Sequence, residues 1–292
     1  MNNYKSKPNT LVLLAAFNGE SWIKKQIISI LNQKNINLKL VISIDKSDDN
    51  TVKICEDLKK NNNRIEILPY GKKFGGAAKN FFYLIKSVDL QKFDYIALSD
   101  QDDVWFEYKI TDSISKLNNK KSKAISSDVL AWFPDGNIKK VKKSWPQKKY
   151  DYLFESAGPG CTYLFEKNSF QIFKNFLIEK WHDANQIIFH DWLIYAFYRK
   201  NNYAWHIDQE PLMKYRQHKN NFFGFNFGTK AILKRVILIK RSWYKNEVLK
   251  IKDILNIDKS LNYSFLIRNF WKLRRRPRDA FVLLLISLFG LF

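Results

Sequence analysis

Three carboxylates crowd residues 98–105, Leu-Ser-Asp-Gln-Asp-Asp-Val-Trp, where Asp100, Asp102 and Asp103 fall within four positions. They follow an apolar run, residues 94–99, that is typical of a buried strand. Like charges at a strand end raise one another's pKa, and such a cluster is usually tolerated because a cation binds there. A divalent metal with oxygen ligands is therefore the predicted occupant. The alternative is a solvated acidic turn that caps the following helix.

Three more polar segments follow runs that are expected to be strands. The first is residues 16–20, a turn with an acid at its end. The second begins at Asp45, where a carboxylate can accept a hydrogen bond from a pyrimidine N–H. The third, residues 71–79, is a basic glycine loop that opens a helix, and such a loop favours close approach of an anion. This loop has neither the dinucleotide-binding fingerprint nor the spacing of a P-loop.

Strands and helices are predicted to alternate through the first part of the chain. Strands are expected at residues 10–17, 38–44, 64–68 and 94–98, and helices at 20–33, 49–60 and 77–88. A further strand is expected at 161–165, after a turn at 158–160. This order indicates an α/β fold, a Rossmann-like, mainly parallel sheet with helices on both faces. Because ligands bind such sheets at the carboxyl ends of the strands, the four polar segments are expected on one edge.

The amino-acid composition indicates which kinds of partner the protein binds and in which cellular compartment it is found. The 292 residues include 50 Lys and Arg against 28 Asp and Glu, a formal charge of +22, which indicates an anionic partner: nucleic acid, a membrane surface or a phosphorylated substrate. Cys55 and Cys161 lie far apart and form no metal-type pair, so a reducing compartment is expected. The polar N-terminus lacks an apolar signal region. A cytosolic location is therefore predicted.

Seven segments, taken in order, resemble the inverting family 2 glycosyltransferases of the GT-A fold. They are Ala-Ala-Phe-Asn-Gly-Glu (15–20), Ser-x-Asp-x-Ser-x-Asp-Asn-Thr (43–51), Gly-Gly-Ala-Ala-Lys-Asn (75–80), Asp-Gln-Asp-Asp (100–103), Gly-Pro-Gly-Cys-Thr (158–162), His-Asp-Trp (190–192) and Tyr-Arg-Gln-His (215–218). The fourth and the last segments are most similar to the rhamnosyltransferase subgroup. The resemblance runs from about residue 10 to residue 221, and its specificity comes from the order and spacing of the segments together.

The resemblance implies a donor-binding side for a nucleotide-diphosphate sugar. Asp45 would bind the pyrimidine base, and Asp100 would lie near the ribose. The turn after the first strand and the glycine loop would complete this side through Ala16, Phe17, Glu20 and Lys79. Arg216 and His218 would face the diphosphate, where a cation or an imidazole helps the leaving group depart.

The resemblance also implies a metal ion, a catalytic base and an acceptor side. Asp102, with His218, would bind the Mg²⁺ or Mn²⁺ that bridges the donor diphosphate. Asp191 would be the general base that takes a proton from the acceptor hydroxyl, and the anomeric configuration would invert. The acceptor side would include Gly160, Cys161, His190 and Trp192. Without the resemblance, Asp191 is better interpreted as a first-turn acid of a buried helix.

Beyond residue 220 the chain is expected to be helical and basic. Residues 230–252 predict a basic amphipathic helix, typical of a membrane surface or of a helix packed on the domain. Arg274 to Arg278 precede an apolar run, 281–292, that is too short to cross a bilayer, because about 20 residues are needed. The tail is expected to anchor in the cytoplasmic leaflet with its arginines on anionic headgroups, or to pack across a homodimer. Removing residues 274–292 is expected to leave activity on a soluble acceptor.

The sequence thus predicts a metal-dependent inverting glycosyltransferase bound peripherally to the cytoplasmic face of the membrane. Residues 1–220 would form the GT-A domain, with a nucleotide-sugar half to about residue 120 and an acceptor half after it. Residues 221–292 would form the membrane-associating region. The expected donor is dTDP-rhamnose or a UDP-hexose. The expected acceptor is an oligosaccharide or a lipid-linked glycan in surface polysaccharide assembly, such as capsule or O-antigen.

Two other classes of protein are alternatives. A basic nucleic-acid-binding protein would suit the charge of +22, but the sequence has no helix-turn-helix, zinc-finger or RNA-binding aromatic signature. Nucleic acid is therefore not an expected partner. A nucleotidyltransferase would share the sheet and the acidic metal site. It would need a glycine-rich phosphate loop directly after the first strand, which residues 16–20 do not provide.

Overall fold

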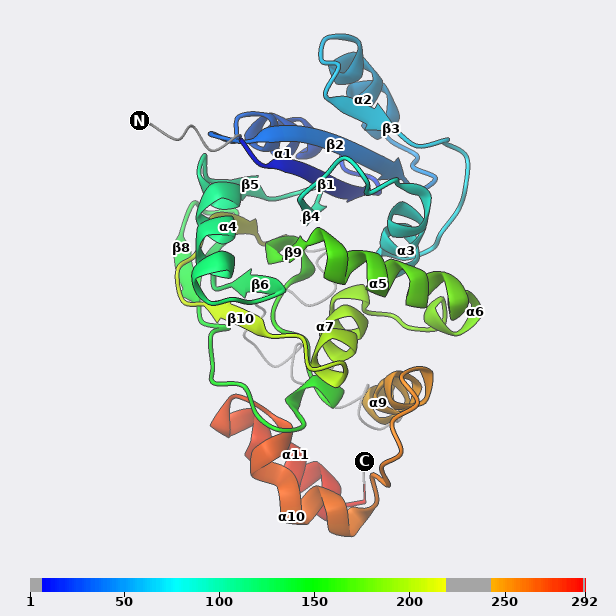
Figure 1. Ribbon diagram of the computed structural model, residues 1–292, viewed down its shortest axis with the longest axis vertical. Helices are drawn as coiled ribbons and strands as arrows, with labels where there is room; N and C mark the ends of the chain where they lie inside the picture. The colour runs from blue at the N-terminus through cyan, green and yellow to red at the C-terminus, as the bar shows by residue number, and fades with distance from the viewer. Residues whose placement is uncertain (1–6, 219–242, 291) are drawn as a thin grey trace.

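The structure, a computed structural model, describes residues 7–218, 243–290 and 292 (Figure 1). Its main sheet contains β1 (Asn9–Ala16), β2 (Asn37–Ile44), β3 (Ile65–Ile67), β4 (Tyr95–Asp100), β6 (Ala124–Ser127), β9 (Leu164–Glu166) and β10 (Trp205–Asp208). A smaller sheet contains β5 (Val104–Trp105), β7 (Val129–Trp132), β8 (Ile138–Val141) and β11 (Met213–Arg216). The first four predicted strands are therefore present. The strand expected from residue 161 begins at Leu164, because a 3₁₀ turn, η2 (Gly160–Thr162), precedes it.

The predicted, mainly parallel α/β sheet is confirmed. Its strand order is β10-β6-β9-β4-β1-β2-β3. β9 runs antiparallel to β4 and β6, and each other neighbouring pair is parallel. The smaller sheet has the order β5-β11-β7-β8, so β11 brings residues near 216 next to the segment that follows β4.

Helices cover both faces of the main sheet (Figure 1). One core includes side chains from α1 (Ile23–Leu31), α2 (Thr51–Lys60) and α4 (Lys109–Asn119). The other includes side chains from α3 (Ala77–Ser87), α5 (Lys167–Glu179) and α7 (His190–Lys200). Successive residues of a strand point to opposite faces. In β1, Val12 and Leu14 accordingly join the first core, whereas Leu11 and Leu13 join the second.

The C-terminal helices lie at the end of the molecule opposite to α2 (Figure 1). They are α9 (Trp243–Ile254), α10 (Tyr263–Leu273) and α11 (Pro277–Leu288). The predicted boundary near residue 220 and most of the helix predicted at 230–252 lie outside the described residues, and the remainder of that helix is part of α9. Within the described ranges, no helix has the length and apolar character needed to cross a membrane.

The position predicted for the tail arginines is wrong for two of them. Arg275 is 5% exposed and forms ion pairs with Asp151 and Glu155, and Arg274 pairs with Glu155 at 3.8 Å. Asp151 is fully buried, and a buried carboxylate is stable only beside a compensating charge or hydrogen-bond donor. These two arginines therefore bind residues 151–155 and do not reach lipid headgroups.

Candidate active site

The carboxyl ends of β1, β2 and β4 meet at one edge of the sheet, as predicted. Ala16 of β1 pairs with Ile44 of β2, and Ala15 pairs with Asp100 of β4. Asn80 of α3 fixes this edge, because its side-chain amide donates to the carbonyl oxygens of Ala16 and of β2 at 3.2 Å. Ala16 is 1% exposed, and its carbonyl oxygen already accepts from Asp45 N and Asn80, so its contact with a donor stays a prediction.

Asp45 holds the glycine loop against the sheet. Its Oδ1 accepts hydrogen bonds from the backbone N–H groups of Lys46 and Phe74, both at 2.8 Å, and its Oδ2 accepts from Gly75 N at 3.0 Å. A carboxylate has about four lone-pair positions, so one further donor can still bind. Base recognition by Asp45 stays a prediction. Lys79 lies exposed in the first turn of α3, directly after this loop.

Gln101, which the sequence did not single out, joins the turn after β1 to the acidic cluster. Phe17 N donates to Gln101 Oε1 at 2.7 Å, and Gln101 Nε2 donates to Phe17 O at 2.6 Å. A Cβ on Gly19 would lie 2.3 Å from Gln101 Oε1, so a larger residue there would displace the Gln101 amide. Glu20 Oε2 accepts from the backbone and side-chain nitrogens of Asn50, each at 2.9 Å. In the sequence, the position of Gln101 between Asp100 and Asp102 was the feature that could have identified it as a site residue.

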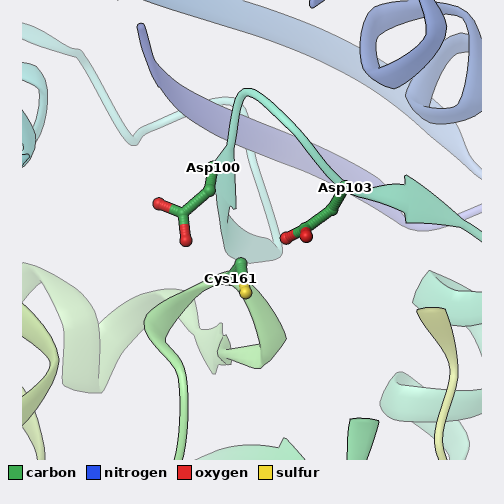
Figure 2. A group of neighbouring side chains, drawn as sticks. All are labelled: Asp100, Asp103 and Cys161. Carbon is green, nitrogen blue, oxygen red and sulfur yellow. The ribbon is translucent and has the colours of Figure 1, made fainter. Parts of the chain in front are cut away.

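The acidic cluster lies after β4. Asp100, Asp103 and Cys161 present ligand atoms within 4.8 Å of one another (Figure 2). Burial, followed by the charge of Asp102, raises the pKa of Asp100 to about 7 and the pKa of Asp103 well above its usual range. Asp103 Oδ1 accepts from the backbone N–H of residue 216, and its Oδ2 has no hydrogen-bond partner within the described residues. Burial also raises the pKa of the Cys161 thiol, and a protonated thiol is a poor metal ligand.

Asp102 and His218 lie together, as the resemblance implied. His218 Nε2 is 2.6 Å from Asp102 Oδ2, and Arg216 Nε donates to Asp102 O at 2.7 Å. The His218 ring stacks on Trp22 with centroids 4.3 Å apart, a contact that the sequence did not predict. Carboxylate oxygens and imidazole nitrogen suit Mn²⁺, and carboxylates suit Mg²⁺. Burial and then the charge of Asp102 raise the pKa of Asp100, and a divalent cation would offset both, so the residues fit such an ion.

Asp191 lies in the first turn of α7 and has the character of a base. Burial raises its pKa to about 6, while the backbone N–H of Trp192, the Ser156 hydroxyl and the Lys143 ammonium lower it. The carboxyl group is therefore mostly ionised at neutral pH and close to the range useful for general-base catalysis. After burial and the charge of Asp102, the charge of Asp191 contributes to the raised pKa of Asp100.

Gly160 allows a close approach between η2 and the start of α7. A Cβ on Gly160 would lie 2.5 Å from His190 Nε2 and 3.3 Å from Asp191 Cβ. The His190 ring stacks on Phe81 with centroids 4.0 Å apart, and burial lowers the pKa of His190 to about 3. A neutral imidazole therefore supports the turn beside Asp191.

All four residues predicted on the acceptor side, Gly160, Cys161, His190 and Trp192, are buried. Cys161 is fully buried. Trp192 is 5% exposed, donates from Nε1 to Tyr152 O at 3.0 Å and stacks on Tyr244. Cys161 and Trp192 both pack in the hydrophobic core, and direct contact with an acceptor stays a prediction.

Residues 11–180 match the family described as Glycosyl transferase family 2. The dTDP-rhamnosyl transferase RfbG of Shigella flexneri is 43% identical over 289 residues, 96% of this chain and 100% of that protein. The mannosyltransferase PcManGT of Pyrobaculum calidifontis, in complex with GDP-Man and Mn²⁺, has a TM-score of 0.56 at 12% identity over 98% of this chain and 76% of that chain. S. aureus TarS 1–349 with UDP-GlcNAc has a TM-score of 0.54 at 14% identity over 97% and 80% of the two chains. Similarity of structure at such low identity shows a shared fold.

Proposed function

Because the chain belongs to glycosyl transferase family 2 and is a glycosyltransferase of GT-A fold, we propose that it transfers rhamnose from dTDP-rhamnose. The acceptor would be a glycan or a lipid-linked oligosaccharide in surface polysaccharide assembly. The Shigella flexneri relative, whose name states this donor, supports the proposal over nearly the whole chain. The observation that carries it is the pairing of Asp102 with His218 beside Asp100, whose carboxyl group also experiences the charge of Asp191.

A divalent cation is proposed on the donor side. When bound, Mg²⁺ or Mn²⁺ would stabilise the charge that develops on the departing diphosphate. Asp102 and His218 would hold the ion, and stacking on Trp22 would fix the orientation of the His218 ring. Arg216 lies beside this pair and would add positive charge near the diphosphate. The Mn²⁺ in the complex of PcManGT supports the choice of a divalent metal.

Asp191 is proposed as the base on the acceptor side. Its carboxylate would accept the proton of the acceptor hydroxyl while that oxygen attacks the anomeric carbon from the face opposite the diphosphate. A bond forms between the acceptor oxygen and the anomeric carbon, the bond to the diphosphate oxygen breaks, and the configuration inverts. Lys143, whose ammonium lowers the pKa of Asp191, would keep the base ionised.

A donor screen tests the proposal. Calorimetry with Mn²⁺ should show tighter binding of dTDP-rhamnose than of UDP-glucose, UDP-galactose or UDP-GlcNAc. The Asp191→Asn variant should keep this affinity and lose about 10²- to 10⁴-fold in transfer rate, the usual contribution of a general base. Preference for a UDP-hexose would replace the proposed donor. Loss of donor affinity in the variant would remove Asp191 from the role of base.

We also propose that α10 and α11 bind an anionic membrane surface on its cytoplasmic side. The exposed apolar side chains of α11 and of the residue after it are Phe281, Val282, Leu285, Leu288 and Phe289. Their spacing of one, four, seven and eight residues places them on one side of the helix. Exposed apolar side chains that gather on one side of a helix are typical of a surface that binds a partner.

Cations next to this apolar face favour a lipid partner. Trp271 of α10 is 43% exposed and contacts Phe281 with centroids 5.5 Å apart. Lys148 Nζ lies 5.6 Å from the centre of the Trp271 ring, and Arg268 is three residues before Trp271 on the same helix. Arg278 is likewise exposed, three residues before Phe281. Apolar insertion combined with basic residues gives firm binding to anionic lipids, where either alone is marginal.

Vesicle flotation tests the membrane proposal. Leu285→Glu should abolish flotation with anionic vesicles, because it places a charge in the centre of the apolar face. Ile28→Glu, a matched change at a 41% exposed apolar residue of α1, should leave flotation intact. High salt should release the wild-type protein only partly. Equal flotation of both variants would contradict the proposal, and a wild-type dimer that Leu285→Glu dissociates would identify a homodimer face instead.

A further inference from the structure

The C-terminal region holds the segment that leads into the glycine turn beside Asp191. Arg274 Nη1 donates to Phe154 O at 2.8 Å, and Arg275 Nη2 donates to Ser156 O at 2.6 Å. Ser156 precedes the turn by only two residues. The connection between α10 and α11 therefore fixes the backbone of the acceptor half at Phe154 and at Ser156.

Arg275 is buried among carboxylates that balance its charge. Its backbone N–H donates to Glu155 Oε1 at 2.5 Å, and Nη2 lies 3.6 Å from Glu155 Oε2. Its Nη1 lies 3.5 Å from Asp151 Oδ2, while Asp151 Oδ1 also pairs with Arg199 at 3.0 Å. Within the described residues Nε and Nη1 form no hydrogen bond, so the charges of Asp151 and Glu155 and the Nη2 bond to Ser156 O hold the buried guanidinium group in place. Arg275 can therefore set the position of Ser156 closely.

A run of hydrogen bonds continues from Ser156 to the base. Ser156 Oγ donates to Gly158 O at 3.1 Å, and Tyr163 Oη donates to the same oxygen at 3.0 Å. Tyr163 Oη also lies 3.5 Å from Asp191 O. The Ser156 hydroxyl is close enough to Asp191 to lower the pKa of its carboxyl group. The placement of Ser156 thus affects both the backbone and the charge of Asp191.

We propose that Arg275 is a positioning residue for glycosyl transfer: it fixes Ser156 and the glycine turn, so that Asp191 meets the acceptor hydroxyl. This inference rests on the proposed role of Asp191 as the base. The C-terminal region then belongs to the catalytic unit. Removing residues 274–292 should reduce transfer even to a soluble acceptor, in contrast to the expectation from the sequence.

Arg275→Met tests the proposal, because it removes the guanidinium group and keeps most of the apolar stem. The variant should bind donor within twofold of the wild type, lose at least tenfold in kcat and show a higher KM for a soluble acceptor. The acid limb of its pH–rate profile should move to higher pH, since displaced Ser156 no longer lowers the pKa of Asp191. Arg276→Met, the same change at the next and exposed position, should leave all four quantities unchanged.

Two further variants keep the test decisive if Arg275→Met does not fold. Ser156→Ala should move the acid limb in the same direction without altering any arginine. Arg275→Lys should recover part of kcat, because the charge between Asp151 and Glu155 is retained. A wild-type pH profile in Ser156→Ala, or a wild-type kcat in Arg275→Met, would overturn the inference. Failure of the proposed function would look different, because Asp191→Asn would then transfer at the full rate.

Discussion

Replacing Gly160 by Ala should misplace the proposed base without altering the donor side. The added Cβ would lie 2.5 Å from His190 Nε2 and 3.3 Å from Asp191 Cβ. Favourable contacts between such atoms are longer by roughly 1 Å. His190 cannot retreat easily, because its ring stacks on Phe81 at 4.0 Å. The start of α7 has to shift instead, and Asp191 shifts with it.

The expected magnitudes follow from that displacement. Overpacking of this size costs about 1–3 kcal/mol in the free energy of unfolding. A displacement of about 1 Å at a reacting group can reduce the rate about 10²-fold. On the activation barrier, this loss corresponds to about 2.7 kcal/mol. Initial rates with a soluble acceptor measure the effect on transfer, urea titration measures stability, and calorimetry should show unchanged donor affinity.

A double-mutant cycle shows whether the imidazole transmits the effect. His190→Ala removes the ring that the new Cβ would meet. Gly160→Ala should therefore cost less in the His190→Ala background than in the wild type, with a coupling energy above about 0.5 kcal/mol. Strictly additive effects, or a wild-type kcat in Gly160→Ala, would refute the reasoning.

Three further predictions concern the carboxyl groups. Transfer should fall as pH drops below about 6, because protonated Asp191 cannot accept the acceptor proton, and a pH–rate profile without this limb would exclude Asp191 as the base. Asp102→Asn should abolish metal-dependent donor binding in calorimetry while the unfolding midpoint stays the same or rises, and full metal-dependent turnover in this variant would contradict the assignment. The pKa of Asp100 is raised to about 7 from about 3.9 in the unfolded chain, so its contribution to stability is present below pH 4 and is lost as pH rises towards 7. In urea titrations of metal-free protein, Asp100→Asn should therefore lose less stability between pH 4 and pH 7 than the wild type.

The sheet and the edge that carries the site could be predicted because they depend on local patterns. Apolar periodicity identified the strands, and a parallel sheet brings the ends of β1, β2 and β4 together whatever their side chains are. Family membership then decides for glycosyl transfer over the nucleotidyltransferase and nucleic-acid-binding alternatives.

Contacts between distant segments could not be predicted in the same way. The sequence shows that Arg275 is charged, but not that Glu155, 120 residues earlier, is its partner. The stacking of Trp22 on His218 likewise depends on β11 returning beside the acidic cluster. Nor does the spacing of three acids reveal which of them pairs with the imidazole, because the shape of the turn decides that.

The ion pairs between residues 151–155 and Arg274 and Arg275 also limit how this enzyme can be recombined with its relatives. A chimaera with a crossover anywhere between these two segments would separate charges that are buried together. A crossover after residue 199 would leave Asp151 with Arg199, whereas Glu155 would lose both of the arginines with which it pairs. Exchange of C-terminal regions to redirect acceptor choice must therefore transfer the two segments as a set.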